Sequence, residues 1–400
     1  MSNLSGWIIA AQDCGAVIVA KRLSANDSGA TGAHQVGLYF TRSVVDQLFP
    51  EMHLLRDIEN PKLEIQSSFS SHVVLTQEVT LTWYNNRNRG GTRNEFRLTG
   101  WGGKASPIQD TESTGSLVLF AFSQDSRQQH ICDLWLCRDV DEEEIVDAAL
   151  GVVEPGEMAV LFSPNGLKGT TSLVEHDFEK PLLPASWNGQ FPMGQDLVTE
   201  SVRLVPEHGV GIDRLLIMRR EVEFELFRQL ENSIASPRIQ EGFKTLDEFI
   251  QFAGSLTNRR KSRSGKSLEL QVKELLERQG VHFNYDSRIE GGKRPDFLFP
   301  SVSEYEDPST SPVKLAMLAV KTTCKDRWRQ ILNEASRIPT KHLLTLQEGV
   351  SEGQFAEMSE SQVVLVVPEP LHSKYPKSVR SQLLTVEDFV NHIQVLESKT

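Results

Sequence analysis

Residues 295–334 read PDFLFPSVSEYEDPSTSPVKLAMLAVKTTCKDRWRQILNE, and this stretch decides the fold of the second half of the chain. Its two apolar runs, at 295–299 and 314–323, have the length and composition of buried strands, and a polar segment separates them. A helix is predicted at 326–337. Because the sites of α/β sheets gather at strand ends, a carboxylate that starts one strand and a lysine that ends the next can meet at one sheet edge.

Three side chains of this stretch, Asp296, Lys321 and Glu334, suit metal-assisted phosphodiester cleavage. The two carboxylates can hold Mg²⁺, and the lysine can steer the attacking water and offset phosphate charge. Glu269, at the margin of an earlier helix, can add a supporting carboxylate. A cluster of oxygen ligands and lysine without histidine favours magnesium and phosphate over zinc and peptide. Ordinary structural roles stay open for all three residues. Asp296 can simply start a strand, Lys321 can be an ordinary strand-end lysine, and Glu334 can pair with Arg337 on the helix surface.

Helix and strand patterns alternate around this stretch, which predicts an α/β sheet. Further strands are predicted at 342–347 and 363–367, and helices at 213–230, 245–253, 264–279, 351–360 and 386–396. The first half of the chain instead shows short apolar or alternating runs at 71–84, 116–123, 131–138 and 157–163, separated by turn-rich segments. Such spacing is typical of a β-barrel or sandwich.

A chain of 400 residues is too long for one ordinary domain. Residues 181–194 are rich in Pro and Gly without periodicity, which indicates a linker or an ordered arm. We therefore expect a β-rich domain at 1–175, a linker at 176–205 and an α/β domain at 206–400.

The composition, 39% hydrophobic and 24% charged, is that of a soluble globular chain, and no apolar run approaches a membrane span. No basic residue precedes the short apolar stretch at the N-terminus, so a signal peptide is not indicated and a cytoplasmic protein is expected. The four cysteines include no CxxC pair, which gives no support to a zinc site or disulfides and favours buried, reduced thiols.

The net charge of −12 argues against a simple nucleic-acid coat protein but not against an enzyme with local basic surfaces. The acidic run at 139–147 predicts a solvated helix start. Two basic clusters stand out, one at 258–267 and one formed by Lys325, Arg327 and Arg329 around Asp326. Arginine can bind guanine bidentately and a carboxylate can accept from cytosine N4, so residues 325–327 have the chemistry to read a G·C pair. A solvated basic helix start is the alternative for either cluster.

At these residues the sequence resembles the EcoRII restriction endonuclease family. The matching segments are NRRKSRSGKSLEL at 258–270, PDFLFP at 295–300, LAVKTTCKDRWRQILNEA at 318–335, LTLQEGV at 344–350 and KRLSANDSGATGAHQVGL at 21–38. The resemblance spans nearly the whole chain.

The resemblance implies an N-terminal B3-like, DNA-binding β-pseudobarrel and a C-terminal domain with the restriction-endonuclease fold and a variant PD-(D/E)xK site. It implies a homodimeric, Mg²⁺-dependent type IIE enzyme that cuts double-stranded DNA before the first C of CCWGG and binds a second copy of the site as an allosteric effector. Base extrusion is consistent with it. The implied catalytic residues are Asp296, Lys321, Glu334 and Glu269, with Asp296 and Glu334 as metal ligands.

Two sets of DNA-binding residues follow from the same resemblance. The target set, in the C-terminal domain, is Arg259, Arg260, Lys261, Arg263, Lys266, Lys325, Asp326 and Arg327. The effector set, in the N-terminal domain, is Lys21, Arg22, Asn26, His34, Tyr39, Arg87, Arg93, Glu95 and Arg97. The chain departs from the family at Gly91 and Phe96, where the family has basic residues, and this bears on the strength of effector binding.

Two other classes of function stay open from the residues. One is a sequence-specific DNA-binding regulator with a degenerate nuclease fold, and the other is a repair nuclease without sequence preference.

Overall fold

The computed structural model describes residues 3–32, 37–74, 76–164, 169–172, 181–207 and 209–398. The chain forms two compact units. The barrel unit comprises Met1–His176, Gln347–Phe355 and Ser373–Ser381, and the α/β unit comprises Asp177–Leu346, Ala356–His372 and Gln382–Thr400. The predicted architecture, a β-rich N-terminal domain and an α/β C-terminal domain, is confirmed. The return of two late segments to the barrel unit was not indicated by the sequence.

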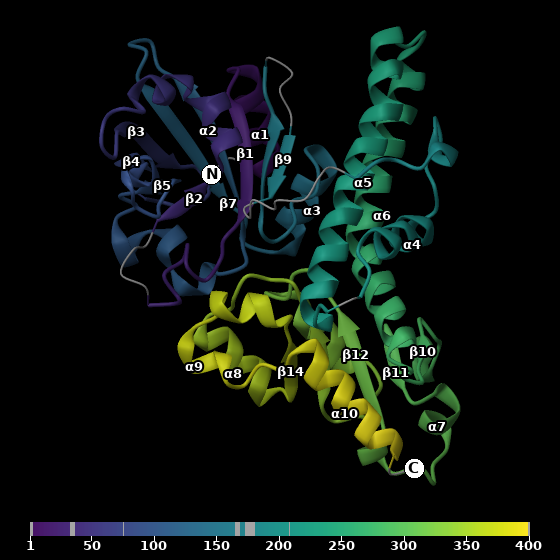
Figure 1. Cartoon of the computed structure of the whole chain (residues 1–400). Coiled ribbons are helices and arrows are strands. Elements are labelled where there is room, and N and C mark those ends of the chain that lie inside the picture. Colours follow the sequence, from purple (N-terminus) through teal and green to yellow (C-terminus); the bar gives the residue numbers. More distant parts are fainter. Residues whose placement is uncertain are drawn as a thin grey trace. The chain divides into compact units, whose positions relative to one another are not determined.

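The barrel unit is built on a nine-stranded sheet of order β2-β5-β4-β3-β7-β6-β1-β8-β9 (Figure 1). All neighbours pair antiparallel except β3 and β7, which are parallel. The strands are β1 (Val17–Arg22), β2 (Leu38–Phe40), β3 (Lys62–Phe69), β4 (Gln77–Tyr84), β5 (Glu95–Thr99), β6 (Leu117–Gln124), β7 (His130–Leu136), β8 (Glu157–Phe162) and β9 (Gly169–Ser172).

The strand alternation of this sheet separates two apolar clusters. In β6, Phe120 and Phe122 face one cluster with Phe40 and Trp101, while Leu119 faces the other. Helices α1 (Leu4–Asp13) and α3 (Val140–Ala149) close the second cluster, and α2 (Arg42–Leu48) contributes Val44 and Val45 to the first. Phe96 belongs to the first cluster and stacks on Trp83, so its side chain points into the core.

The α/β unit holds a five-stranded sheet of order β10-β11-β12-β13-β14. The strands are β10 (Asn284–Tyr285), β11 (Phe297–Phe299), β12 (Ala316–Val320), β13 (Lys341–Leu344) and β14 (Val363–Val366). β10, β11 and β12 pair antiparallel, whereas β12, β13 and β14 pair parallel. The carboxyl ends of the parallel strands therefore meet at one edge, as the predicted α/β sheet requires.

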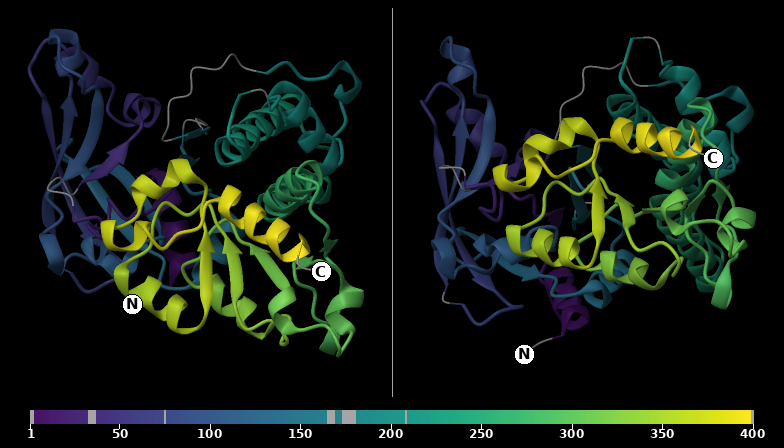
Figure 2. Two further views of the ribbon diagram at one scale, coloured as in Figure 1. Left: turned by 60° about the horizontal axis from the view of Figure 1, so that its bottom comes forward. Right: turned by 90° about the horizontal axis from the view of Figure 1, so that it is seen from below.

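The helices of the α/β unit include α4 (Gly194–Leu204), α5 (Ile212–Glu241), α6 (Leu246–Arg278), α7 (Val302–Glu306) and α10 (Val386–Ser398). α4 packs on α5 and α6, and α10 lies along one sheet face in Figures 1 and 2. On this face Leu268 and Leu275 of α6 and Phe389 of α10 join Phe297 and Leu318 in one core cluster. α8 (Glu352–Glu360) runs from one unit into the other along the sequence, and α9 (Lys377–Arg380) belongs to the barrel unit.

Several predicted elements differ from the structure. The helices expected at 245–253 and 264–279 are one helix, α6, which continues through the basic cluster. The helix expected at 326–337 is a 3-10 helix, η9 (Arg327–Asn333), so Glu334 lies after it and not within it. The strand expected at 71–84 begins only at Gln77.

Two further expectations concern the linker and the cysteines. The segment expected as a linker at 176–205 contains α4, whose Leu197 and Val198 are buried. Residues 176–180 lie outside the described residues. Cys14 is exposed, contrary to the expectation of buried thiols, whereas the other three cysteines are buried and free. No helix among the described residues is long and apolar enough to cross a membrane.

Candidate active site

The register of β11 against β12 brings Asp296 to the end of β12. Phe297 pairs with Leu318 in this antiparallel ladder, so Asp296, one residue before β11, lies beside the last residues of β12. Its Oδ2 accepts a hydrogen bond from the backbone N–H of Val320 at 2.7 Å. The same oxygen accepts from Lys321 Nζ at 3.1 Å. The structure thus joins the first two predicted site residues at one sheet edge.

Glu334 reaches the same edge from the turn after η9. Its pKa is raised to about 7, first by burial and then by the negative charge of Asp296, against the opposing effect of Lys321 and two further lysines. Its Oε2 is buried and has no hydrogen-bond partner in the described part of the chain. A buried carboxylate oxygen without a partner is costly unless a ligand satisfies it.

These observations fit a divalent cation. Asp296 and Glu334 supply carboxylate oxygens, which hard cations prefer, and the unsatisfied oxygen of Glu334 is available for coordination. No group of three His, Cys, Asp or Glu side chains suited to a metal occurs within the described residues.

Glu269 lies on the β10 side of this edge, within its own polar cluster. Its Oε2 accepts from Lys266 Nζ at 2.9 Å and from the Tyr285 hydroxyl at 3.1 Å. Tyr285 pairs with Phe297 across β10 and β11. Burial raises the pKa of Tyr285 to about 12, with the charge of Glu269 adding to it and Lys266 opposing it. Glu269 thus lies near β11, the strand that Asp296 precedes, but its hydrogen-bond partners are Lys266 and Tyr285.

The basic cluster at 258–267 lies on α6, where its members have different surroundings. Arg260 is bonded to Glu231 at 2.6 and 2.7 Å, whereas Lys261 is exposed. Arg259 stacks on Phe191, and Arg263 lies over the rings of Phe224 and Phe227. Arg259, Arg263 and Lys266 line a cavity of about 790 Å³ together with Phe191 and Glu223. Its rim of cations suits a phosphate-rich ligand.

The candidate base-reading residues Lys325, Asp326 and Arg327 follow Lys321 at the start of η9 and are half-buried. Arg329, two residues further, is exposed and bonded to Glu357 at 2.6 Å. Asp326 lies 3.6 Å from Arg329.

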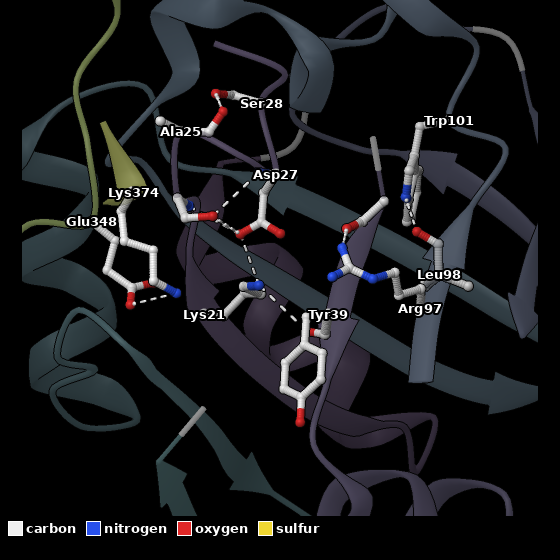
Figure 3. Close-up of polar contacts among 12 residues, drawn as sticks. Lys21, Ala25, Asp27, Ser28, Tyr39, Arg97, Leu98, Trp101, Glu348 and Lys374 are labelled. Atoms are coloured by element: carbon white, nitrogen blue, oxygen red, sulfur yellow. Dashed lines mark hydrogen bonds and ion pairs between the residues drawn. The ribbon is translucent and has the colours of Figure 1, made fainter. Parts of the chain in front are cut away.

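Lys21 and Arg22, the first two residues of the predicted effector set, are buried in the barrel unit. The Lys21 ammonium lies 2.8 Å from Asp27 Oδ2 and 3.4 Å from the Tyr39 carbonyl oxygen (Figure 3). Arg22 donates to Glu143 at 2.8 Å, and that carboxylate belongs to the acidic run expected to be solvated. Glu142 and Glu143 are buried, so the expectation of a solvated helix start was wrong.

The remaining residues of the effector set are more accessible. Asn26 and Tyr39 are half-buried and Arg87 is exposed. On β5, Glu95 accepts from Arg93 at 2.9 Å and from Arg97 at 3.1 Å. Burial would raise the pKa of Glu95, but the hydrogen bonds from Arg97 and Arg93 outweigh it and hold the pKa below its usual value. His34 lies outside the described residues.

The late segments of the barrel unit contact the loop that carries Asn26. The backbone N–H of Ala25 donates to the Glu348 carbonyl at 2.9 Å. Gly349 packs against Ala25 so closely that a Cβ added to it would lie 2.4 Å from the Cβ of Ala25. Ser351 Oγ donates to Glu112 Oε1 at 2.6 Å, and Glu348 pairs with Lys374 at 3.5 Å (Figure 3).

The groups that support Glu334 could not be recognised from the sequence. Lys341 and Glu290 hold the turn that carries it through bonds to its backbone. A lysine at the start of a strand and a glutamate in a glycine-rich loop look like surface residues in a sequence. Only the tertiary structure shows their role in the turn.

Comparison with known proteins gives matches to both halves of the chain. The family model described as the N-terminal part of restriction endonuclease EcoRII matches residues 12–165, and the EcoRII C-terminal model matches residues 227–390. The type II restriction enzyme EcoRII of Escherichia coli is 43% identical over 396 residues, which cover 98% of this chain and 97% of that protein.

Two solved structures are similar to part of the chain. Metal-depleted Ecl18kI in complex with uncleaved, modified DNA has a TM-score of 0.45 at 21% identity, covering 52% of this chain and 80% of that one. The PspGI–substrate DNA complex has a TM-score of 0.43 at 19% identity, covering 52% and 94%.

Together with the carboxylates and lysine at the sheet edge, these matches define a site-specific deoxyribonuclease of the type II restriction class. The chain belongs to the EcoRII restriction endonuclease family.

Proposed function

We propose that the chain hydrolyses double-stranded DNA at CCWGG, before the first C, with Mg²⁺ bound by Asp296 and Glu334. The observation that carries the proposal is the edge at which Lys321 contacts Asp296 while a buried oxygen of Glu334 lacks a partner. The family's site preference and the 43% identity to a type II restriction enzyme support the choice of substrate.

In this mechanism the chain's own residues bind and orient the scissile phosphate. A divalent cation at the two carboxylates would supply an activated water and stabilise the leaving oxygen. Lys321, held 3.1 Å from Asp296, places an ammonium beside the phosphate and offsets its growing negative charge. The Val320 N–H fixes the orientation of Asp296, so its carboxylate needs little rearrangement as the reaction proceeds.

The same proposal assigns DNA contacts to the two residue sets. Arg259, Lys261 and Arg263 contact phosphates of the target, and Lys325, Asp326 and Arg327 read its C·G pairs. Asn26, Tyr39, Arg87, Arg93 and Arg97 contact effector DNA. Lys21 and Arg22 orient the effector loop through their buried ion pairs with Asp27 and Glu143. The enzyme acts in the cytoplasm as a homodimer.

We also propose that the barrel unit restrains cleavage until effector DNA binds. Support comes from residues 347–355, which dock on the loop that carries Asn26 and on Glu112. Effector DNA at this loop would compete with the docked segment. A truncated chain that tests this should begin at Pro181 and not at Val205, since α4 packs in the α/β unit through Leu197 and Val198.

Digestion of a plasmid of known sequence with Mg²⁺, followed by sequencing of the ends, tests the proposal. We expect ends at CCWGG only. Tight site binding without nicking would support a regulator, and ends scattered over the plasmid would support a repair nuclease.

Lys321→Ala should abolish cleavage and leave DNA binding intact, because its ammonium offsets charge on the phosphate and does not hold the DNA. Cleavage rate and site affinity are measured for the same preparation. Lys314→Ala, which changes a lysine before the opposite end of β12, is the matched control and should cut normally. Retained cleavage by Lys321→Ala would remove this lysine from the mechanism.

A further inference from the structure

One buried lysine, Lys341, donates hydrogen bonds to the backbone of the turn that carries Glu334. Lys341, the first residue of β13, is 4% exposed. Its Nζ donates to the backbone carbonyl oxygens of Ala335 at 2.8 Å and of Ile338 at 2.6 Å, and also to that of Glu334. An ammonium has three N–H donors, so the turn uses all of them.

The turn needs this support because its backbone is unfavourable by itself. Ala335 has φ +43°, in the left-handed region, which is unfavourable for a residue with a Cβ. The carbonyls that face inward would also be buried without a partner if the ammonium were absent. Lys341 therefore stabilises a conformation that the local sequence disfavours, and Glu334 is the residue at which this conformation begins.

We propose that Lys341 is a positioning residue that fixes the backbone of Glu334 so that its carboxylate faces Asp296. This inference rests on the proposed function, in which both carboxylates bind the metal ion. Groups that hold a metal ligand in place typically change metal affinity or activity by 10–100-fold when they are removed.

Other charged groups around the turn do not replace Lys341. Glu290 accepts from the N–H of Ser336 at 3.0 Å and from its hydroxyl at 2.9 Å, and Lys293 donates to the carbonyl of Asn333. Both hold the flanks of the turn. The bond to the Glu334 carbonyl itself comes from Lys341.

Arg337 offers a matched comparison within the same turn. Its guanidinium donates to the carbonyl oxygens of Asp307 at 2.9 Å and Thr310 at 2.7 Å, and to that of Tyr305. It also has several bonds to backbone carbonyls, but they tie the turn to residues 305–310 and not to Glu334. Loss of Arg337 should therefore lower stability without displacing the carboxylate.

The test compares full-length Lys341→Met, Arg337→Met and Glu334→Gln with the native chain. Mn²⁺ binding without DNA is measured by EPR of the free ion, and the Mn²⁺ dependence of single-turnover cleavage is measured in parallel. We expect Lys341→Met to weaken Mn²⁺ binding roughly 10–100-fold and to raise the half-saturating Mn²⁺ concentration similarly. Its cleavage rate should recover largely at saturating Mn²⁺. Arg337→Met should bind Mn²⁺ as the native chain does.

The outcomes separate the inference from the function on which it rests. If Glu334→Gln binds Mn²⁺ like the native chain, the proposed metal site is wrong. If Glu334→Gln weakens binding and Lys341→Met does not, only the positioning role is wrong. A Lys341→Met protein with a lower active fraction but an unchanged half-saturating Mn²⁺ concentration also overturns the role. If Lys341→Met does not fold, Lys341→Gln is judged by the same criteria.

Discussion

The ionisation of Glu334 ties the candidate site to pH. Burial and the charge of Asp296 raise its pKa to about 7, so without a metal ion the carboxyl group is partly protonated at neutral pH. A bound cation would favour the ionised form. The ionised Glu334 side chain suits metal binding, but without a metal ion its ionisation destabilises the folded chain as the pH rises.

This leads to a prediction for Glu334→Gln in EDTA. The folded-state pKa lies above the ordinary glutamate pKa of 4.5, so the unfolded chain loses its proton first and stability falls as the pH rises from about 4.5 to about 7. Glutamine has no proton to lose. The variant should match the native chain near pH 4 and exceed it at pH 8, by at most about 3 kcal/mol at 1.4 kcal/mol per pKa unit.

Thermal unfolding at both pH values measures this difference. Glu306→Gln, which changes an exposed glutamate on α7, is the control for the substitution itself. Equal stability of Glu334→Gln and the native chain at pH 8 would contradict the raised pKa.

Arg327 offers a second test for a single residue. If it binds a guanine bidentately, Arg327→Ala should lose roughly 1–3 kcal/mol of binding to the specific site and little binding to random DNA. Competition binding with the two kinds of duplex measures both affinities. Arg329→Ala is the matched control, since Arg329 is already bonded to Glu357. Equal weakening on both duplexes would make Arg327 a phosphate contact.

At the scale of elements, α6 shows what local patterns can and cannot predict. The apolar stripe after residue 264 is periodic, and the helix there was predicted for that reason. The preceding basic stretch has no such period. It is helical because α5 supports it, through the Arg260–Glu231 ion pair and the rings under Arg263. Tertiary contacts of this kind cannot be predicted from the local pattern of a single sequence.

The capping of α10 provides a prediction at this scale. Asp213, buried in the first turn of α5, accepts from the N–H groups of Val386 at 2.8 Å, Glu387 at 3.1 Å and Glu369 at 3.0 Å. Asp213→Ala leaves the buried N–H of Val386 and the part-buried N–H groups of Glu387 and Glu369 without their acceptor. The free energy of opening α10 should fall by roughly 1–3 kcal/mol, the usual loss for buried groups left unsatisfied.

Hydrogen exchange of the α10 amides measures this loss directly. Asp388→Ala, which removes an exposed cap of the same helix, should have a smaller effect, since water can replace the lost acceptor. An equal effect of both variants would contradict the role of Asp213 as a buried cap.

At the scale of the whole molecule, the two units are discontinuous in sequence. Alternation of strand and helix indicated the α/β architecture, and short apolar runs between turn-rich segments indicated the β-rich one. The ends of two apolar runs located Asp296 and Lys321, which the structure places 3.1 Å apart. The return of residues 347–355 to the barrel unit could not be predicted. It depends on the contacts of Gly349 with Ala25 and of Ser351 with Glu112, which join residues far apart along the chain.

Gly349→Ala tests the proposed restraint in the full chain. Gly349 has φ +104°, and an added Cβ would lie 2.4 Å from the Cβ of Ala25 and 2.8 Å from the Lys374 carbonyl oxygen. The docked segment cannot accommodate it, so the variant should cut single-site DNA faster than the native chain without effector DNA. Gly209→Ala carries similar backbone strain at φ +72° in open space and is the control. An unchanged rate for Gly349→Ala would count against restraint.

The discontinuity of the barrel unit also limits how such enzymes can recombine. A crossover near residue 176 would exchange the N-terminal strands but keep residues 347–355 and 373–381 from the other parent. Glu112 and Ala25 would then meet a docking segment that had not evolved with them. Hybrids between relatives should therefore differ in their control of cleavage even when both parental halves fold, and matching the late segments to the incoming barrel should restore that control.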